Sequence, residues 1–159
     1  MAEIKIWETP FKDGDIEIIS TIWGDGSLDA GYCDKRDTYS LEPTINHLYE
    51  LSIEVFHRQT NSIYGVFFES ISAFRMLDEN GLLEIWEARD TQSIEFSNTY
   101  YIKDHQWSKE SFISFYQSYQ HEWSFLLATD FMCVEILSSD HPKIMKKEDR
   151  KIKIGKISD

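Results

Sequence analysis

The residues that could carry out chemistry lie far apart in this chain and form no recognised ligand or nucleophile spacing. The two cysteines, Cys33 and Cys133, belong to no C-x-x-C or Cys/His pattern, so we expect two free thiols that serve in packing. The five histidines form no H-x-x-x-H or H-x-H pair; they are His47, His57, His105, His121 and His141. The sequence therefore predicts no metal ion and no other cofactor.

Motifs for the common enzyme mechanisms are absent from the sequence as well. The chain contains no G-x-G-x-x-G or G-x-x-x-x-G-K-[ST] phosphate loop and no G-x-S-x-G nucleophile elbow. Paired acids such as Asp78-Glu79 would need a cleft that raises the pKa of one carboxyl before they could act as general acid and base. Solvated charge is the simpler explanation, so the sequence predicts that the protein is not an enzyme.

The chain is strongly acidic, and its charge is distributed unevenly. The formal net charge is −12, from 28 acids and 16 bases. Residues 143–159 hold seven bases and three acids, a net charge of +4, which leaves −16 on residues 1–142. A body of this charge would repel nucleic acid and anionic membranes and would attract a basic partner. The alternative is that the acids serve solubility alone.

The length of the chain, and the lack of a signal or membrane segment in its sequence, predict one domain of an intracellular protein. A chain of 159 residues is the size of one ordinary domain. We expect a single acidic globular domain over residues 1–142, followed by a basic C-terminal tail or edge strand over 143–159. No basic segment followed by an apolar run begins the chain, and no stretch reaches the roughly 18 apolar residues of a membrane span. The sequence thus predicts a cytoplasmic protein that does not enter a membrane.

Alternation of apolar and polar residues predicts mainly β-structure. The strand candidates cover residues 15–23, 51–55, 64–77, 82–86, 94–102, 123–127 and 132–136. Between two of them, Asp78-Glu79-Asn80-Gly81 predicts a hairpin turn, because Asn and Gly tolerate positive φ. A four-residue loop would place Arg75 opposite Glu84, and a two-residue loop at Asn80-Gly81 would place it opposite Trp86. Residues 24–43 are rich in Gly, Asp and Ser and predict a long loop.

One segment has the spacing of a helix instead of a strand. Phe112, Phe115, Tyr116 and Tyr119 lie at i, i+3, i+4 and i+7, which predicts an amphipathic helix near residues 105–120 with these four side chains on one buried face. The predicted fold is therefore α+β, a mainly antiparallel curved sheet or half-barrel with one helix.

The central part of the chain resembles a known group of proteins. Residues 64–86, YGVFFESISAFRMLDENGLLEIW, followed by a Tyr-rich strand at 99–102, a Trp-led helix at Trp107 and a last hairpin ending in Val134-Glu135-Ile136, are similar to a pattern in small uncharacterised bacterial proteins. The likeness covers residues 64–142. Some of those proteins resemble immunity proteins of toxin–immunity systems. The resemblance implies a binding protein and carries no enzymatic role.

The sequence thus leads to two functions of different classes. The first is a cytosolic immunity protein that binds and neutralises a cognate, basic toxin domain, and the alternative is a small-molecule-binding protein or an enzyme with a cryptic pocket. For the first, the expected contact surfaces are the acidic loop and the acidic turn, because loops carry recognition while strands carry the fold. The partner-binding candidates are Asp25, Asp29, Asp34, Asp37, Glu42, Asp78, Glu79, Glu84 and Glu87.

Overall fold

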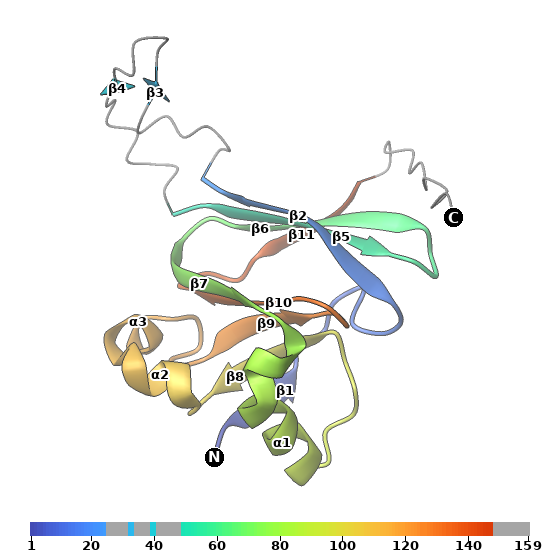
Figure 1. The fold of residues 1–159 in the computed structure, drawn as a ribbon, viewed down its shortest axis with the longest axis vertical. Coiled ribbons are helices and arrows are strands. Elements are labelled where there is room, and N and C mark those ends of the chain that lie inside the picture. Colours follow the sequence, from blue (N-terminus) through green and yellow to red (C-terminus); the bar gives the residue numbers. More distant parts are fainter. Residues whose placement is uncertain (25–31, 34–38, 41–48, 148–159) are drawn as a thin grey trace.

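The fold is α+β with antiparallel sheets, which confirms the expected class (Figure 1). The computed structural model describes residues 1–24, 32–33, 39–40 and 49–147. Within these residues, nine strands form two antiparallel sheets that do not close into a barrel. Two further short strands, β3 (Tyr32–Cys33) and β4 (Tyr39–Ser40), pair only with each other. Three short helices and one 3-10 turn complete the described chain.

The larger sheet has five strands in the order β1-β8-β9-β10-β7. Their bounds are Glu3–Ile6 for β1, Thr99–Lys103 for β8, Ser124–Ala128 for β9, Cys133–Ser138 for β10 and Ile71–Leu77 for β7. The strands β9 and β10 form the last hairpin that the alternation predicted. The first strand, β1, pairs with β8, so that Glu3 lies opposite Lys103 and the two side chains form an ion pair of 3.3 Å.

The smaller sheet has four strands in the order β11-β6-β5-β2. Their bounds are Lys143–Lys147 for β11, Ser62–Phe68 for β6, Leu51–His57 for β5 and Ile16–Trp23 for β2. The strand β11 takes up the first five residues of the basic C-terminal segment and pairs with β6. The rest of the basic segment, residues 148–159, lies outside the described residues.

The two sheets and the helices form three layers, and an apolar core fills the space between each pair of neighbouring layers. In Figure 1 the four-stranded sheet packs over one face of the five-stranded sheet, and the helices lie on the other face. The first core fills the space between the sheets, with Leu51 and Ile53 from one side and Phe125 and Val134 from the other. A second core joins the far face of the five-stranded sheet to the helix α1 (Leu83–Thr91).

The predicted hairpin at residues 78–86 is wrong, because the segment is helical. A 3-10 turn, η1 (Glu79–Leu82), leads directly into α1. The Asp78 carboxylate accepts a hydrogen bond of 2.9 Å from the backbone N–H of Gly81, so the residues expected to turn a hairpin cap a helical turn. The apolar spacing of residues 82–88 buries Leu82, Ile85 and Ala88 on one side, as a helix does.

The long strand predicted over residues 64–77 is two strands that belong to different sheets. The first, β6, ends at Phe68, and the second, β7, begins at Ile71. Glu69 and Ser70 make the corner between them, and the backbone C=O of Ser70 accepts hydrogen bonds from the N–H of Ser139 (3.0 Å) and the Oγ of Ser138 (3.1 Å). These bonds hold the corner without glycine or proline, which is why the alternation continues through it.

The predicted amphipathic helix is two short helices, α2 (Gln106–Glu110) and α3 (Phe112–Tyr116), with a break at Ser111. Only Phe115 of the predicted stripe is fully buried, and Tyr119 packs partly against the first core. Phe112 is 61% exposed and Tyr116 is 59% exposed, so the single buried face is wrong. The break turns α3 and changes which side chains face the sheet.

Candidate functional site

A serine, a histidine, an arginine and a carboxylate, the residue types best able to carry out chemistry, form a buried cluster around Glu135 in the middle of β10. Its Oε2 accepts hydrogen bonds from Arg75 Nε (2.9 Å) and Nη2 (2.6 Å) on β7, and its Oε1 accepts one from Ser124 Oγ (2.5 Å) on β9. His105, which begins α2, places Nε2 2.8 Å from Oε1, although not in hydrogen-bond geometry. A serine, a histidine and a carboxylate thus meet at one point.

This cluster has the residue types of a hydrolase but not the arrangement. Ser124 donates to Glu135 and not to His105, so the histidine is not placed to take the serine proton. Glu135 and His105 are each 1% exposed, and Ser124 is completely buried, so the cluster is closed to a substrate. It instead fastens α2 to the five-stranded sheet, with the Arg75 guanidinium also 4.7 Å from the centre of the Trp107 ring.

The charges of the cluster favour an ionised Glu135. Burial by itself would raise the pKa of this carboxyl, but the contacts to His105, Arg75 and Ser124 outweigh it and hold the pKa below its ordinary value of 4.5. The negative charge is therefore present at neutral pH, and it is compensated inside the protein.

Neither a reactive thiol nor a metal site is found in the described part of the chain. Burial raises the pKa of the Cys133 thiol to about 11, so this thiol stays protonated and unreactive at neutral pH. The side chain of Cys33 lies outside the described residues. No group of three His, Cys, Asp or Glu side chains that could hold a metal ion exists among the side chains described.

The acids predicted to contact a partner separate into three sets. Asp25, Asp29, Asp34, Asp37 and Glu42 lie outside the described residues. Asp78 and Glu79 lie at η1, beside the tip of the β9–β10 hairpin, and their charges act on Cys133 at the start of β10. Glu84 accepts a hydrogen bond of 2.9 Å from the backbone N–H of Gln106 on α2, and Glu87 is exposed on α1. Of the four candidates that the structure describes, Asp78 and Glu79 lie together at the hairpin tip.

The hairpin tip beside these two acids displays an aromatic side chain on a rigid turn. Thr129 holds the turn: its N–H (3.0 Å) and Oγ1 (2.8 Å) donate to the backbone C=O of Met132, and its Oγ1 accepts from the N–H of Phe131 (3.3 Å) and Met132 (3.0 Å). The Phe131 side chain is nevertheless 82% exposed. An exposed aromatic on a fixed backbone loses little conformational entropy when a partner covers it.

Two adjacent hollows adjoin this tip, with volumes of about 260 and 320 Å³. They share Phe96, Thr129 and Asp130, and the first is also lined by Glu79 and Trp86. Phe96 is 63% exposed. We name Glu79, Trp86, Phe96, Asp130 and Phe131 together the tip surface.

The hollow that Glu79 and Asp130 line also contains one base, Arg89. Arg89 lies over the rings of Trp86 and Phe96, 5.4 and 5.9 Å from their centres, but its guanidinium donates two hydrogen bonds to Asp90. No ion pair of the described residues involves Glu79 or Asp130. Exposed carboxylates suit a lysine or arginine side chain, which gains a charge-assisted hydrogen bond there.

Sequence reasoning identified Glu79 but missed the other four residues of the tip surface. The alternation predicts a strand over 94–102 that includes Phe96, whereas the strand β8 spans Thr99–Lys103. The sequence predicts Trp86 at the end of a hairpin strand, whereas it lies in the helix α1. The signal for Phe131 was available, because a phenylalanine placed directly after a Thr-Asp turn has no strand neighbours to pack against.

A third hollow, of about 410 Å³, is apolar and contains no acid or histidine among its described lining residues. Trp23, Tyr49 and Phe74 supply its aromatic rings, with Ile71, Ser72 and Ala73 along the edge of β7. Among the lining residues that the structure describes, there is no charged group of the kind that fixes a polar substrate in an enzyme pocket.

Comparison of the chain with protein-family models, with curated proteins and with solved structures found no match. The likeness over residues 64–142 therefore stays a prediction. Within the described residues, none of the helices has the length and apolar character needed to cross a membrane.

Proposed function

We propose that the protein is an immunity protein that binds a basic toxin domain through the tip surface and so neutralises it. The observation that supports this most is the exposed Phe131 on a hydrogen-bonded turn, directly after Asp130, which lines a hollow together with Glu79. Central aromatic anchors carry most of the energy of protein interfaces.

The net charge of −12 supports the same partner class. An acidic protein gains about 10–10³-fold in association rate with a basic partner through electrostatic steering. It can also occupy the basic cleft of an enzyme that acts on nucleic acid. The buried position of Glu135, His105 and Ser124 supports binding over catalysis, because these side chains are closed to a substrate.

Co-expression with the toxin domain encoded next to the gene tests the proposal. The expected result is protection of the cells, together with a complex that calorimetry detects at low salt. We expect Phe131→Ala to weaken the complex by about 30-fold or more, which is about 2 kcal/mol. Phe112→Ala is the matched control, because Phe112 is also an exposed phenylalanine but lies on α3.

The double change Glu79→Gln and Asp130→Asn should mainly slow association and reduce its dependence on salt, because exposed charges at an interface rim act on the on-rate. No protection and no complex at low salt would refute the immunity function. A complex that tolerates all three changes would retain the function and reject the tip surface. The acids at 25, 29, 34, 37 and 42 would then be the next set to neutralise.

The alternative, a small-molecule-binding protein, is tied to the apolar hollow of about 410 Å³ beside Trp23 and Phe74. An aromatic hollow of this size suits an uncharged, apolar molecule. A titration of tryptophan fluorescence with such molecules, compared between the wild type and Phe74→Ala, tests this alternative.

A further inference from the structure

One edge of the five-stranded sheet lacks the protection that the other sheet edges have. The edge strands of the two sheets are β1, β7, β2 and β11. Exposed edges invite pairing with another chain, and native proteins guard them with lysines, bulges or covering groups. The strand β11 carries three lysines, and β2 has a break in register between Ile18 and Ser20. At β1, the side chain of Gln92 donates to the C=O of Ala2 (2.7 Å) and accepts from the N–H of Ile4 (3.4 Å).

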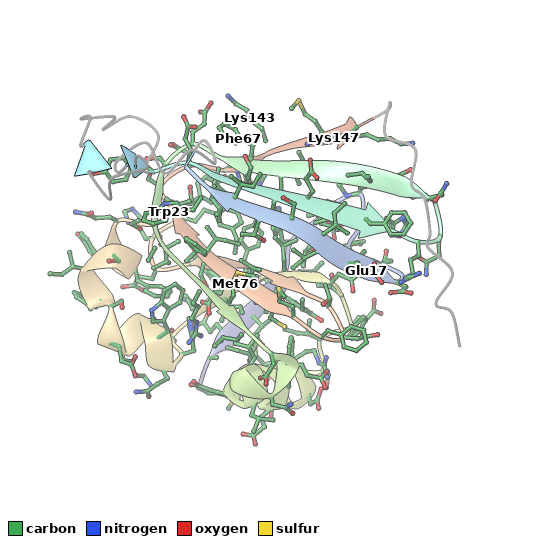
Figure 2. The ribbon with its side chains drawn as sticks, turned by 45° about the horizontal axis from the view of Figure 1, so that its top comes forward. Glu17, Trp23, Phe67, Met76, Lys143 and Lys147 are labelled. Atoms are coloured by element: carbon green, nitrogen blue, oxygen red, sulfur yellow. The ribbon has the colours of Figure 1, made fainter. Side chains whose placement is uncertain are left out.

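Within the described chain, none of these devices guards residues 73–77 of β7. The register shift of β7 against β10 comes before this stretch, and the pairing along the stretch itself is unbroken. Its one charged residue, Arg75, donates its guanidinium hydrogen bonds to Glu135 of the same sheet. In Figure 2, β7 runs from the side of Trp23 past Met76 to the helix α1, along the border of its sheet.

The hydrogen-bond pattern of the hairpin beside β7 fixes which backbone groups of β7 point outward. At the hairpin tip the N–H of Thr129 donates to the C=O of Met132 (3.0 Å), so these two residues form a bonded pair. Bonded and non-bonded pairs alternate along an antiparallel ladder, so the backbone of Glu135 faces β7 and not β9. Glu135 lies opposite Arg75, and the backbone groups of Arg75 therefore face β10.

The N–H and C=O groups of Phe74 and Met76 consequently point away from the sheet. Among the described residues, no hydrogen bond to these four groups is found. The two residues are spaced about 7 Å apart along the strand. At the start of the strand, the outward N–H of Ile71 already donates to the C=O of Tyr49 (2.7 Å). The open positions thus match the spacing at which a second extended backbone presents its own donors and acceptors.

An apolar hollow at the same edge indicates which side chain an added strand would carry. Its volume is about 410 Å³, and its described lining includes residues 71–74 of β7 with Trp23 and Tyr49. Phe74 lines this hollow with its ring centre 6.3 Å from that of Trp23. A residue opposite Phe74 on an added strand would lie on the same face of the sheet, so a large apolar side chain there would enter the hollow.

We propose that β7 is the docking edge for an extended strand of the basic partner, which adds to the five-stranded sheet beside Phe74 and Met76. This binding mode rests on the proposed function, because the partner is the basic toxin domain of that proposal. Asp78 and Glu79 follow directly after Leu77 at the end of β7, so the added strand reaches Glu79 of the tip surface. These acids suit bases that flank the strand, whereas β11 carries three lysines and would not attract it. Strand addition supplies affinity through backbone hydrogen bonds and specificity through alternate side chains.

Amide hydrogen exchange of the free wild-type protein, followed residue by residue by NMR, tests whether the edge is open. We expect the amides of Phe74 and Met76 to exchange at least about tenfold faster than those of Arg75 and Leu77, which bond to β10. Slow exchange of Phe74 and Met76 would mean that the edge is already covered. The chain itself would cover it if the rates are independent of protein concentration, and a second copy would cover it if they are not. Either result would overturn the proposal.

The same measurement on the complex with the toxin domain encoded next to the gene tests the occupant. We expect the amides of Phe74 and Met76 to slow by at least about tenfold, while that of Arg75 stays slow in both states. Met76→Pro removes the outward N–H and leaves the bonds to β10 intact, and Met76→Ala is the matched control that removes the same side chain. We expect Met76→Pro to bind about tenfold more weakly than Met76→Ala.

The outcomes separate this binding mode from the function on which it rests. A complex in which Phe74 and Met76 exchange as in the free protein, or which tolerates Met76→Pro as well as Met76→Ala, would overturn strand addition and leave the immunity function standing. Absence of any complex at low salt would refute both.

Discussion

The buried charge cluster gives the sharpest test of what holds the helices on the sheet. Glu135→Gln keeps the size of the side chain and removes its charge. Gln can still accept one hydrogen bond, but the ion pair with Arg75 is lost in a site where Glu135 is 1% exposed. Removing one partner of a buried ion pair costs about 3–5 kcal/mol. The Arg75 side chain is 28% exposed and partly solvated, so we expect the low end, about 3 kcal/mol.

Urea unfolding at pH 7 measures the change in the free energy of unfolding. Glu69→Gln is the control, because Glu69 pairs with Lys143 on the surface and such a pair contributes about 0–1 kcal/mol. A loss below about 1 kcal/mol for Glu135→Gln would mean that the charge of Glu135 contributes little to stability.

The pH dependence of the free energy of unfolding provides a second, independent test of the charge on Glu135. The pKa of Glu135 is lower in the folded protein than its ordinary value of 4.5, so the unfolded chain takes up the proton first as the pH falls. The difference between wild type and Glu135→Gln should thus be constant above about pH 5 and shrink below it. A difference that stays constant down to pH 3.5, while both proteins remain folded, would refute the assignment of an ionised Glu135.

Three further outcomes are expected from other parts of the fold. Phe115→Ala should cost about 3–5 kcal/mol in a denaturant titration, whereas Phe112→Ala should change stability by less than about 0.5 kcal/mol, because only Phe115 is buried. Cys133 should resist a thiol reagent at pH 8 until the chain unfolds, because the pKa of its thiol is about 11 and its side chain is 1% exposed; rapid labelling of the folded protein would contradict this. Gly14→Ala should destabilise by about 1 kcal/mol, because Gly14 has a φ of +86° and a Cβ there would lie 2.5 Å from the Gln59 side-chain oxygen; thermal unfolding measures it, and an unchanged midpoint would mean that the turn relaxes freely.

The fold class was predictable because alternation reports which side chains face a core, and it did so for residues 51–55 and for the β9–β10 hairpin. The alternation failed where the residues of a segment have the composition typical of a different kind of element. Asp78 to Gly81 has the composition of a hairpin turn, but the apolar spacing after it also fits a helix, and packing of Ile85 against the second core decides between them. The corner at Glu69 and Ser70 carries no breaking residue and is held by bonds to a distant strand.

The candidate sites depended even more on tertiary structure. His105 and Glu135 are thirty residues apart, and Arg75 is a further thirty from His105, so no spacing in the sequence relates them. The same is true of Glu79, Phe96 and Asp130, which come together because η1 and the β9–β10 tip lie side by side. The sequence shows these residues individually, but it does not show that the fold brings them together.

The pairing of β1 with β8 also bears on how the chain folds as it is made. The partner of Glu3 is Lys103, so the first strand has no place to bind until about a hundred more residues have been synthesised. At about 5–20 residues per second, this leaves β1 unpaired for roughly 5–20 s, longer than most small domains need to fold. The charged Glu3 and Lys5 alternate with Ile4 and Ile6 along that strand. They would keep the waiting strand from pairing with the wrong edge, as charged residues that flank aggregation-prone strands do in other proteins.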